Sequence, residues 1–290
     1  MRLPQWVKNG FILAALIFSQ SYSDPSLCGQ AALALLSFCL LSSGIYALND
    51  VFDREADKAH PVKCQRPVAA GHVSVGQAMT LAIILLLCAI GNGAVLGSKF
   101  LLLLGTYAGI NVVYSAGLKR VAILDVMVLA GGFVLRILAG AVAIGVRPSH
   151  WLLLCTLMVS LFLGFAKRRA EMVALDAGAA QTRQVLRHYS VAFLDQAIAM
   201  MTTATLVCYA LYTVDTDTVA HFRTHSLLVT LLPVIYGLFR YLYLIYHRRE
   251  GEDPTQTLWR DSPSLINLLV WIFLIFLIIE FRLVSGFFAT

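Results

Sequence analysis

Residues 27–57 read LCGQAALALLSFCLLSSGIYALNDVFDREAD, a long apolar run followed by several acids. Residues 27–48 carry no charged side chain, and acidic residues begin directly after them. An α-helix rises 1.5 Å per residue, so about 20 apolar residues are enough to cross a bilayer. The stretch therefore predicts a membrane-spanning helix with a group of carboxylates at its end.

The rest of the chain has the same apolar character. Of its 290 residues 59% are hydrophobic and 13% are charged, and the mean hydropathy is +0.78. Soluble domains carry roughly a quarter charged residues, so a soluble domain, a disordered chain and a nucleic-acid-binding module are excluded. The apolar runs are also too long for barrel strands, and an all-α polytopic membrane protein is predicted. The nine predicted helices cover about residues 6–18, 27–48, 76–97, 100–118, 122–146, 151–166, 190–212, 226–246 and 265–288.

The basic residues predict the orientation of the chain. Of 22 Lys and Arg, 16 lie before the first segment or in loops after even-numbered segments, and only Lys99, Arg147 and Arg223 lie in the opposite loops. Loops rich in Lys and Arg stay in the cytosol. We therefore expect a cytosolic N-terminus, a C-terminus on the other side, and cytosolic loops at about 50–75, 118–122, 167–189 and 247–263.

The acidic residues after 27–48 form a pattern of their own. If the helix continues, Tyr46, Asn49, Asp53 and Asp57 share one face, with Asp50 beside them. Like charges on one face repel unless a cation lies among them, and oxygen ligands without His or Cys suit Mg²⁺. An ordinary acidic helix end is the alternative, although the C-terminal end of a helix disfavours acids. We expect a metal site with Asn49 and Asp53 as first ligands and Asp50 and Asp57 next.

Basic residues follow the acids at once, in HPVKCQRP at residues 60–67. The two prolines end any helix and shape a loop. A metal held by acids, with Lys63 and Arg66 close behind, is the combination that binds a diphosphate.

These residues resemble the UbiA superfamily of intramembrane prenyltransferases, through the motif Asn-Asp-x-x-Asp-x-x-x-Asp at residues 49–57. Further motifs look like the decaprenyl-phosphate phosphoribosyltransferase branch of that superfamily, and they span nearly the whole chain. They are RLPQWVKN (2–9), HPVKCQRPVAAG (60–71), YSAGLK (114–119), LDV (124–126), GFVLRILAG (132–140), KRRAE (167–171), RY (240–241) and GEDP (251–254).

The resemblance implies a single domain over residues 1–290, with nine transmembrane helices around a central cavity that opens to the cytosolic side. It implies a Mg²⁺-dependent enzyme, with Mn²⁺ as a possible substitute. The enzyme would transfer a phosphoribosyl group from 5-phosphoribosyl 1-diphosphate to a polyprenyl phosphate of the decaprenyl type. The setting would be a bacterial-type plasma membrane, the product a precursor of cell-envelope glycan (arabinan), and a homo-oligomer would be possible.

Roles for individual residues follow from the charges together with the resemblance. The expected catalytic acids are Asp50, Asp53, Asp57 and Asp125. The expected donor-binding residues are Lys8, Tyr46, Lys63, Arg66, Lys119 and Arg136. The expected lipid-phosphate-binding residues are Lys167 and Arg168, whereas Arg169 is assigned to topology alone.

Arg136 leaves two interpretations open. It lies deep in a predicted membrane helix, where an arginine is costly and should face a polar cavity. It also follows Asp125 by eleven residues on nearly the same helix face, so a structural partner of Asp125 is the alternative.

Two other functions compete with phosphoribosyl transfer. Aromatic-ring prenyltransferases of the superfamily need two acidic clusters around a prenyl diphosphate, whereas the second loop of this chain offers only Asp125. Many cations beside one acidic cluster favour two phosphorylated substrates. A transporter of anionic solutes would show inverted repeats and polar residues near the bilayer midplane, and neither is clear.

Overall fold

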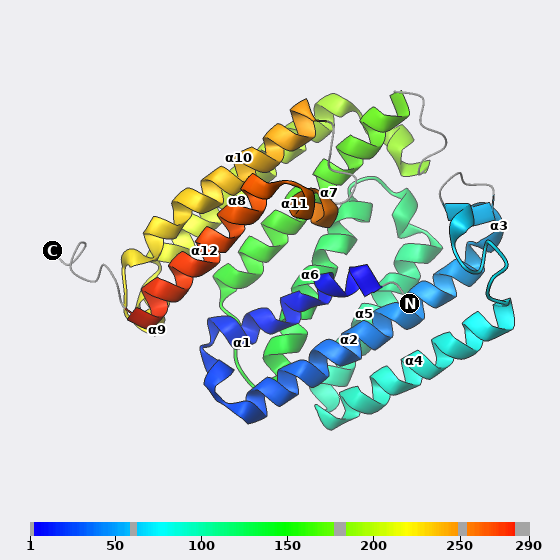
Figure 1. Ribbon diagram of the computed structural model, residues 1–290, viewed down its shortest axis with the longest axis horizontal. Helices are drawn as coiled ribbons and strands as arrows, with labels where there is room; N and C mark the ends of the chain where they lie inside the picture. The colour runs from blue at the N-terminus through cyan, green and yellow to red at the C-terminus, as the bar shows by residue number, and fades with distance from the viewer. Residues whose placement is uncertain (1–2, 59–62, 177–183, 249–253, 282–290) are drawn as a thin grey trace. The chain divides into compact units, whose positions relative to one another are not determined.

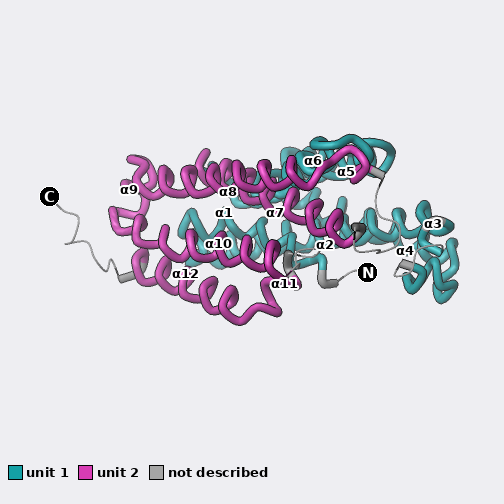
Figure 2. Tube along the Cα trace, turned by 90° about the horizontal axis from the view of Figure 1, so that it is seen from above, with its two compact units in different colours: residues 1–149 teal, residues 150–290 magenta. Residues whose placement is uncertain are grey.

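The computed structural model describes residues 3–58, 63–176, 184–248 and 254–281. It falls into two compact units, Met1–Ser149 and His150–Thr290, which Figure 2 colours separately. None of the residues just given lies in a β-strand. The prediction of an all-α protein is confirmed, while that of a single domain stays a prediction.

Eight helices in the described part of the chain are long and apolar enough to cross a membrane. The predicted first segment forms a shorter apolar helix, Gln5–Phe18, most of it in 3-10 geometry, and it is not one of the eight. The count of nine spanning helices is therefore not confirmed. The eight candidate spans are Pro25–Phe52, Val75–Val95, Ser98–Ala116, Leu124–Ala143, His150–Ala174, Val191–Val214, Ser226–His247 and Ser262–Ile279.

The first unit is built on α2, which lies along α4 (Figure 1). The chain enters α2 through Asp24, whose carboxylate accepts bonds from the N–H groups of Ser26 and Leu27 and so caps the helix. Phe38 and Phe100 pack edge to face in its core. The elements of this unit are η1 (Leu3–Leu13), α1 (Ala14–Phe18), η2 (Ser21–Ser23), α2 (Pro25–Phe52), α3 (Arg54–Lys58), η3 (Lys63–Gln65), α4 (Val75–Val95), α5 (Ser98–Ala116), η4 (Leu118–Arg120) and α6 (Leu124–Ala143).

The N-terminal segment η1 packs against both α2 and α6. Its backbone approaches α6 so closely that a Cβ added at Gly140 would lie 2.0 Å from the carbonyl oxygen of Ile12. Only glycine allows this approach, because any side chain would collide with backbone. Gly140 therefore fixes where η1 lies on α6.

The second unit pairs α7 with α8 and α10 with α12. The helix α7 continues to Asp176, well beyond the predicted end at Ala166, so the predicted loop 167–189 begins as helix. Charged residues with good helix propensity, among them Arg168 and Glu171 paired at i,i+3, carry the helix past its apolar part. The elements are α7 (His150–Asp176), η5 (Gln184–His188), α8 (Val191–Val214), α9 (Thr216–Phe222), η6 (Ser226–Thr230), α10 (Leu231–His247), α11 (Pro254–Arg260) and α12 (Ser262–Phe281).

Candidate active site

The predicted acidic motif lies where α2 gives way to α3. The helix α2 ends at Phe52, Asp53 caps it, and α3 starts at the next residue, so the predicted continuous helix is broken at Asp53. Asp is a poor residue for a helix interior, because its side chain competes for backbone groups. The break is small: the N–H of Asp53 donates to the carbonyl of Asn49 at 2.9 Å, and the N–H of Asp57 donates to that of Asp53 at 2.8 Å.

Arg66, in the loop after η3, joins two of the acids. Its Nη1 lies 2.6 Å from Oδ2 of Asp57 and 3.3 Å from Oδ1 of Asp50. Asp57 is only 3% exposed, so removal of Arg66 would leave a buried carboxylate without this ion pair. The structure thus brings together two acids and one cation that the sequence separates by up to 16 positions.

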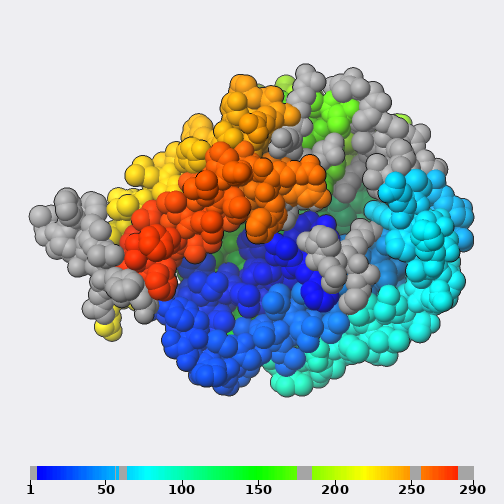
Figure 3. All heavy atoms as spheres, viewed as in Figure 1, coloured from blue at the N-terminus to red at the C-terminus, as the bar shows by residue number. Residues whose placement is uncertain are grey.

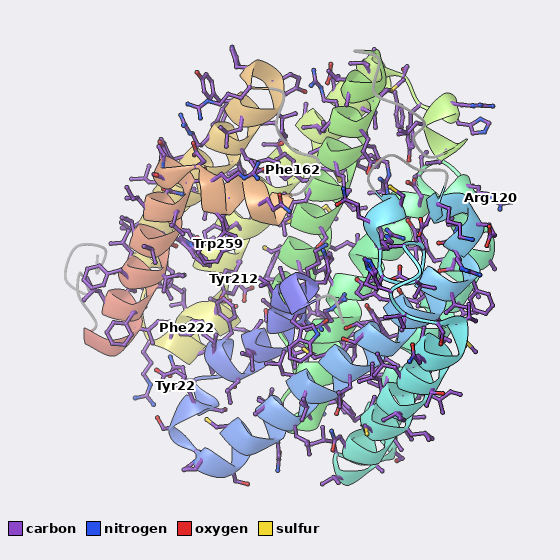
Figure 4. The ribbon with its side chains drawn as sticks, turned by 45° about the vertical axis from the view of Figure 1, so that its right-hand side comes forward. Tyr22, Arg120, Phe162, Tyr212, Phe222 and Trp259 are labelled. Atoms are coloured by element: carbon purple, nitrogen blue, oxygen red, sulfur yellow. The ribbon has the colours of Figure 1, made fainter. Side chains whose placement is uncertain are left out.

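The third acid faces a second cation. Nζ of Lys119, on η4, lies 3.8 Å from Oδ1 of Asp53, and both side chains are partly exposed. The neighbouring Arg120 is exposed (Figure 4). We call Asp50, Asp53, Asp57, Arg66 and Lys119 the acid–base cluster.

The donor set of this cluster suits a hard divalent cation, although the carboxylates are not gathered around one point. Over the described ranges, no group of three or more His, Cys, Asp or Glu is placed to hold a metal ion. The reason is visible in the pairing, because Arg66 lies between Asp50 and Asp57. Those two oxygens lie within 3.3 Å of the same nitrogen. Carboxylate oxygens are the hard donors that Mg²⁺ prefers, and the Arg66 guanidinium now occupies the place of a cation beside two of them. The chemistry of the residues fits the metal.

The other predicted site residues before residue 64 lie on α2, η1 and η3. Tyr46 and Asn49 are half-buried on the last turns of α2, and Lys8 is half-buried on η1. Lys63 begins η3, but its side chain lies outside the described residues, as do His60 and its two following neighbours.

Arg136 is bound by protein groups on every side-chain nitrogen. Its Nε donates to Oδ1 of Asn9 at 2.8 Å, its Nη1 to the carbonyl of Gly132 at 2.8 Å, and its Nη2 to the hydroxyl of Tyr107 at 2.6 Å. Asp125 is fully buried in the first turn of α6, where the helix dipole favours an acid. Eleven residues of helix separate it from Arg136 by about 16 Å, too far for a direct pair.

The cations predicted to bind the lipid phosphate belong to the second unit. Arg168 is 1% exposed and its Nη1 lies 2.7 Å from Oε2 of Glu171, while Lys167 is half-buried. Arg169 also has a structural contact, because its Nε bonds to the carboxylate of Asp195 and its guanidinium lies 4.1 Å from the ring centre of Tyr246. Its role is therefore more than topology.

Asp261 is a polar residue that the sequence patterns did not single out. Its carboxylate accepts two bonds from Arg240, at 2.7 and 3.0 Å, and two from Ser264. The bond from Arg240, followed by those from Ser264, holds the pKa of the Asp261 carboxyl well below its usual range. The signal was present as an Asp three residues before a Ser at the start of an apolar helix, an N-cap pattern.

Asn9 and Tyr107 were also missed as individual residues. Asn9 appeared only as part of the motif at 2–9, and Tyr107 had no signal, because a tyrosine on an apolar helix is ordinary. Their importance comes from contacts over 127 and 29 positions with Arg136.

Comparisons with known proteins agree with this fold. The family model described as the UbiA prenyltransferase family matches residues 10–268. A decaprenyl-phosphate phosphoribosyltransferase of Mycolicibacterium smegmatis is 32% identical over 94% of this chain and 88% of its own length. The protein of that name from Corynebacterium glutamicum is 31% identical over 95% and 84%. A solved UbiA homologue from Archaeoglobus fulgidus, bound to GPP and Mg²⁺, superposes with a TM-score of 0.70 at 19% identity, covering 93% of this chain and 95% of that one.

Proposed function

This chain belongs to the UbiA prenyltransferase family, and from that membership we propose that it transfers the 5-phosphoribosyl group of 5-phosphoribosyl 1-diphosphate to a polyprenyl phosphate, releasing diphosphate. The observation that carries the proposal is the likeness, over nearly the whole chain, to proteins named decaprenyl-phosphate phosphoribosyltransferase. The product would be a precursor of cell-envelope glycan.

The acid–base cluster supports a phosphorylated sugar as the donor. Arg66 and Lys119 already bind anionic oxygens there, and a diphosphate would offer them stronger, charge-assisted bonds. Lys8, Tyr46 and Lys63 complete the proposed donor site. Arg136 was predicted to bind the donor too, and direct contact would require it to give up one of its present bonds.

The reaction needs no nucleophile from the protein. An oxygen of the lipid phosphate attacks C1 of the ribose, the bond from C1 to the diphosphate oxygen breaks, and diphosphate leaves with the electron pair. The transition state resembles an oxocarbenium ion, and direct displacement inverts the configuration at C1. The chain contributes by holding two anionic substrates in line and by neutralising the leaving group.

We assign Mg²⁺, with Mn²⁺ as a substitute, to the oxygens of Asn49, Asp50, Asp53 and Asp57. When bound, the ion would neutralise the charge of the diphosphate. Asp125 stands in the proposal as the remaining catalytic acid, at the start of α6.

Lys167 and Arg168 are the proposed ligands of the lipid phosphate. Arg168 would exchange its bond to Glu171 for one to the phosphate. The charge asymmetry of the loops supports a plasma-membrane protein whose N-terminus and acid–base cluster face the cytosol, with the C-terminus on the other side.

One comparison of donors tests the proposal against its nearest competitor, aromatic-ring prenylation. Purified protein in lipid bilayers would be offered labelled 5-phosphoribosyl 1-diphosphate with polyprenyl phosphate and, separately, labelled prenyl diphosphate with an aromatic acid. We expect a labelled lipid from the first mixture only. A prenylated aromatic product without any phosphoribosyl lipid would replace the proposal by its competitor.

A further inference from the structure

Arg136 has the environment of a structural clamp. Its side chain is 6% exposed, its three nitrogens bond to groups on η1, α5 and α6, and its guanidinium carbon lies 4.8 Å from the ring centre of Tyr107. A buried guanidinium whose donors are satisfied by neutral oxygens loses those bonds when a phosphate takes them. The geometry therefore points away from direct donor binding.

Asn9 extends the clamp from α6 to α2. While its Oδ1 accepts the bond from Arg136, its Nδ2 lies 3.3 Å from both Sγ of Cys39 and Oγ of Ser42, and the residue is 1% exposed. One amide thus ties η1 to two helices at once. Gly140, which admits the carbonyl of Ile12, fixes the next turn of the same segment.

The contacts of η1 also define its direction. Trp6 donates from Nε1 to Oγ of Ser43 at 3.0 Å, whereas Asn9 reaches back to Cys39, so η1 runs antiparallel to α2. Its beginning therefore points toward the end of α2 that carries the acids. In the space-filling view the N-terminal residues, dark blue, lie against α2 (Figure 3). Lys8, a proposed donor ligand, directly precedes the clamped Asn9.

We propose that Arg136 is a positioning residue that acts through Asn9 to hold η1, and with it Lys8, in place for the phosphorylated donor. The part of this statement that concerns the donor rests on the proposed function. The part that concerns η1 rests on the contacts alone.

Amide hydrogen exchange over residues 5–13, without any substrate, tests the clamp. We expect at least tenfold faster exchange in Asn9→Leu and in Arg136→Lys, because leucine removes the acceptor and a compact ammonium cannot reach acceptors on three different elements as the guanidinium does. Asn9→Asp keeps an acceptor for Arg136 but loses the N–H donors that reach Cys39 and Ser42, so its exchange should lie between that of the wild type and that of Asn9→Leu. Tyr107→Phe, which removes only one hydroxyl partner, should give a smaller increase and covers the case in which Asn9→Leu fails to fold.

A matched control is Ser37→Ala, which also removes a buried polar group from this unit. Among the described residues its hydroxyl bonds to the carbonyl of Leu33 in its own helix and to no group of η1, so exchange in η1 should not change. Wild-type exchange in both Asn9→Leu and Arg136→Lys would overturn the clamp.

Steady-state kinetics separate a positioning role from a purely structural one. Asn9→Leu should raise the KM for 5-phosphoribosyl 1-diphosphate about tenfold and leave the KM for polyprenyl phosphate within about twofold, whereas Asn9→Asp, which keeps the acceptor for Arg136, should raise the donor KM less. Faster exchange with an unchanged donor KM would refute the positioning role. A folded wild type that forms no phosphoribosyl lipid would refute the proposed function instead, and the exchange comparison would still decide the clamp.

Discussion

Replacing Arg66 by glutamine tests whether its cation stabilises the carboxylates of the acid–base cluster. The substitution removes the cation 2.6 Å from Asp57 and 3.3 Å from Asp50, and so leaves two nearby carboxylates facing each other, one of them almost fully buried. Removing one partner of a fully buried pair costs about 3–5 kcal/mol. The side chain of Arg66 is 26% exposed, and bonds to charged groups contribute about 1.5–3 kcal/mol, so we expect a loss of about 2 kcal/mol. For the unit Met1–Ser149, a loss of about 2 kcal/mol corresponds to a melting temperature that is lower by roughly 4–8 °C.

The assay is thermal unfolding of the purified protein in detergent, with and without Mg²⁺. Arg120→Gln is the matched control, because Arg120 is exposed and lies in the same unit. Mg²⁺ at millimolar concentration should recover more stability in Arg66→Gln than in the control, since two carboxylates that have lost the Arg66 guanidinium offer it hard oxygen ligands. Equal melting temperatures for both variants, with no difference in their response to Mg²⁺, would refute this reasoning.

Three further predictions concern stability and topology. Asp261→Asn should lower the free energy of unfolding at pH 7. This difference from the wild type should shrink below about pH 4, because the carboxyl paired with Arg240 has a lowered pKa and its contribution to stability is lost as it is protonated. A difference in unfolding free energy that stays constant from pH 3 to 7 would contradict this. Gly140→Ala should lower the melting temperature markedly, since its Cβ would collide with the carbonyl of Ile12, and a wild-type value would show that η1 is not held as described. A cysteine replacing Glu55, which is exposed, should react with impermeant thiol reagents from the cytosolic side only, and labelling from outside intact cells would reverse the proposed topology.

The apolar runs were sufficient to predict the spanning helices, because length and composition decide whether a helix can cross a bilayer. One boundary could not be predicted in this way. The helix α7 continues through Lys167 and Arg168, where hydropathy ends but helix propensity does not.

The acidic pattern predicted that carboxylates gather at the end of α2, close to the cations of the following loops. Asp50, Asp57 and Arg66 do come together, but the pattern could not show that Arg66 itself would lie between the acids. That pairing depends on the path of the loop after η3, which spacing along a helix does not determine.

The contacts of Arg136 could not be predicted from any local sequence pattern. Its partners Asn9 and Tyr107 lie on other elements, so only the packing of η1 and α5 against α6 reveals them. Charge alone suggested Asp125 as a partner of Arg136 on the same helix. A direct contact between the two is excluded, because eleven residues of α-helix separate them by about 16 Å.

The most direct test of phosphoribosyl transfer is a product balance with purified protein in lipid bilayers, polyprenyl phosphate, Mg²⁺ and donor labelled in its ribose. The predicted result is one diphosphate released for each labelled lipid formed, with a lipid mass increased by one phosphoribosyl group and with both products lost in Asp53→Ala. Diphosphate release without a labelled lipid, or full product formation by Asp53→Ala, would contradict the proposed reaction and its site.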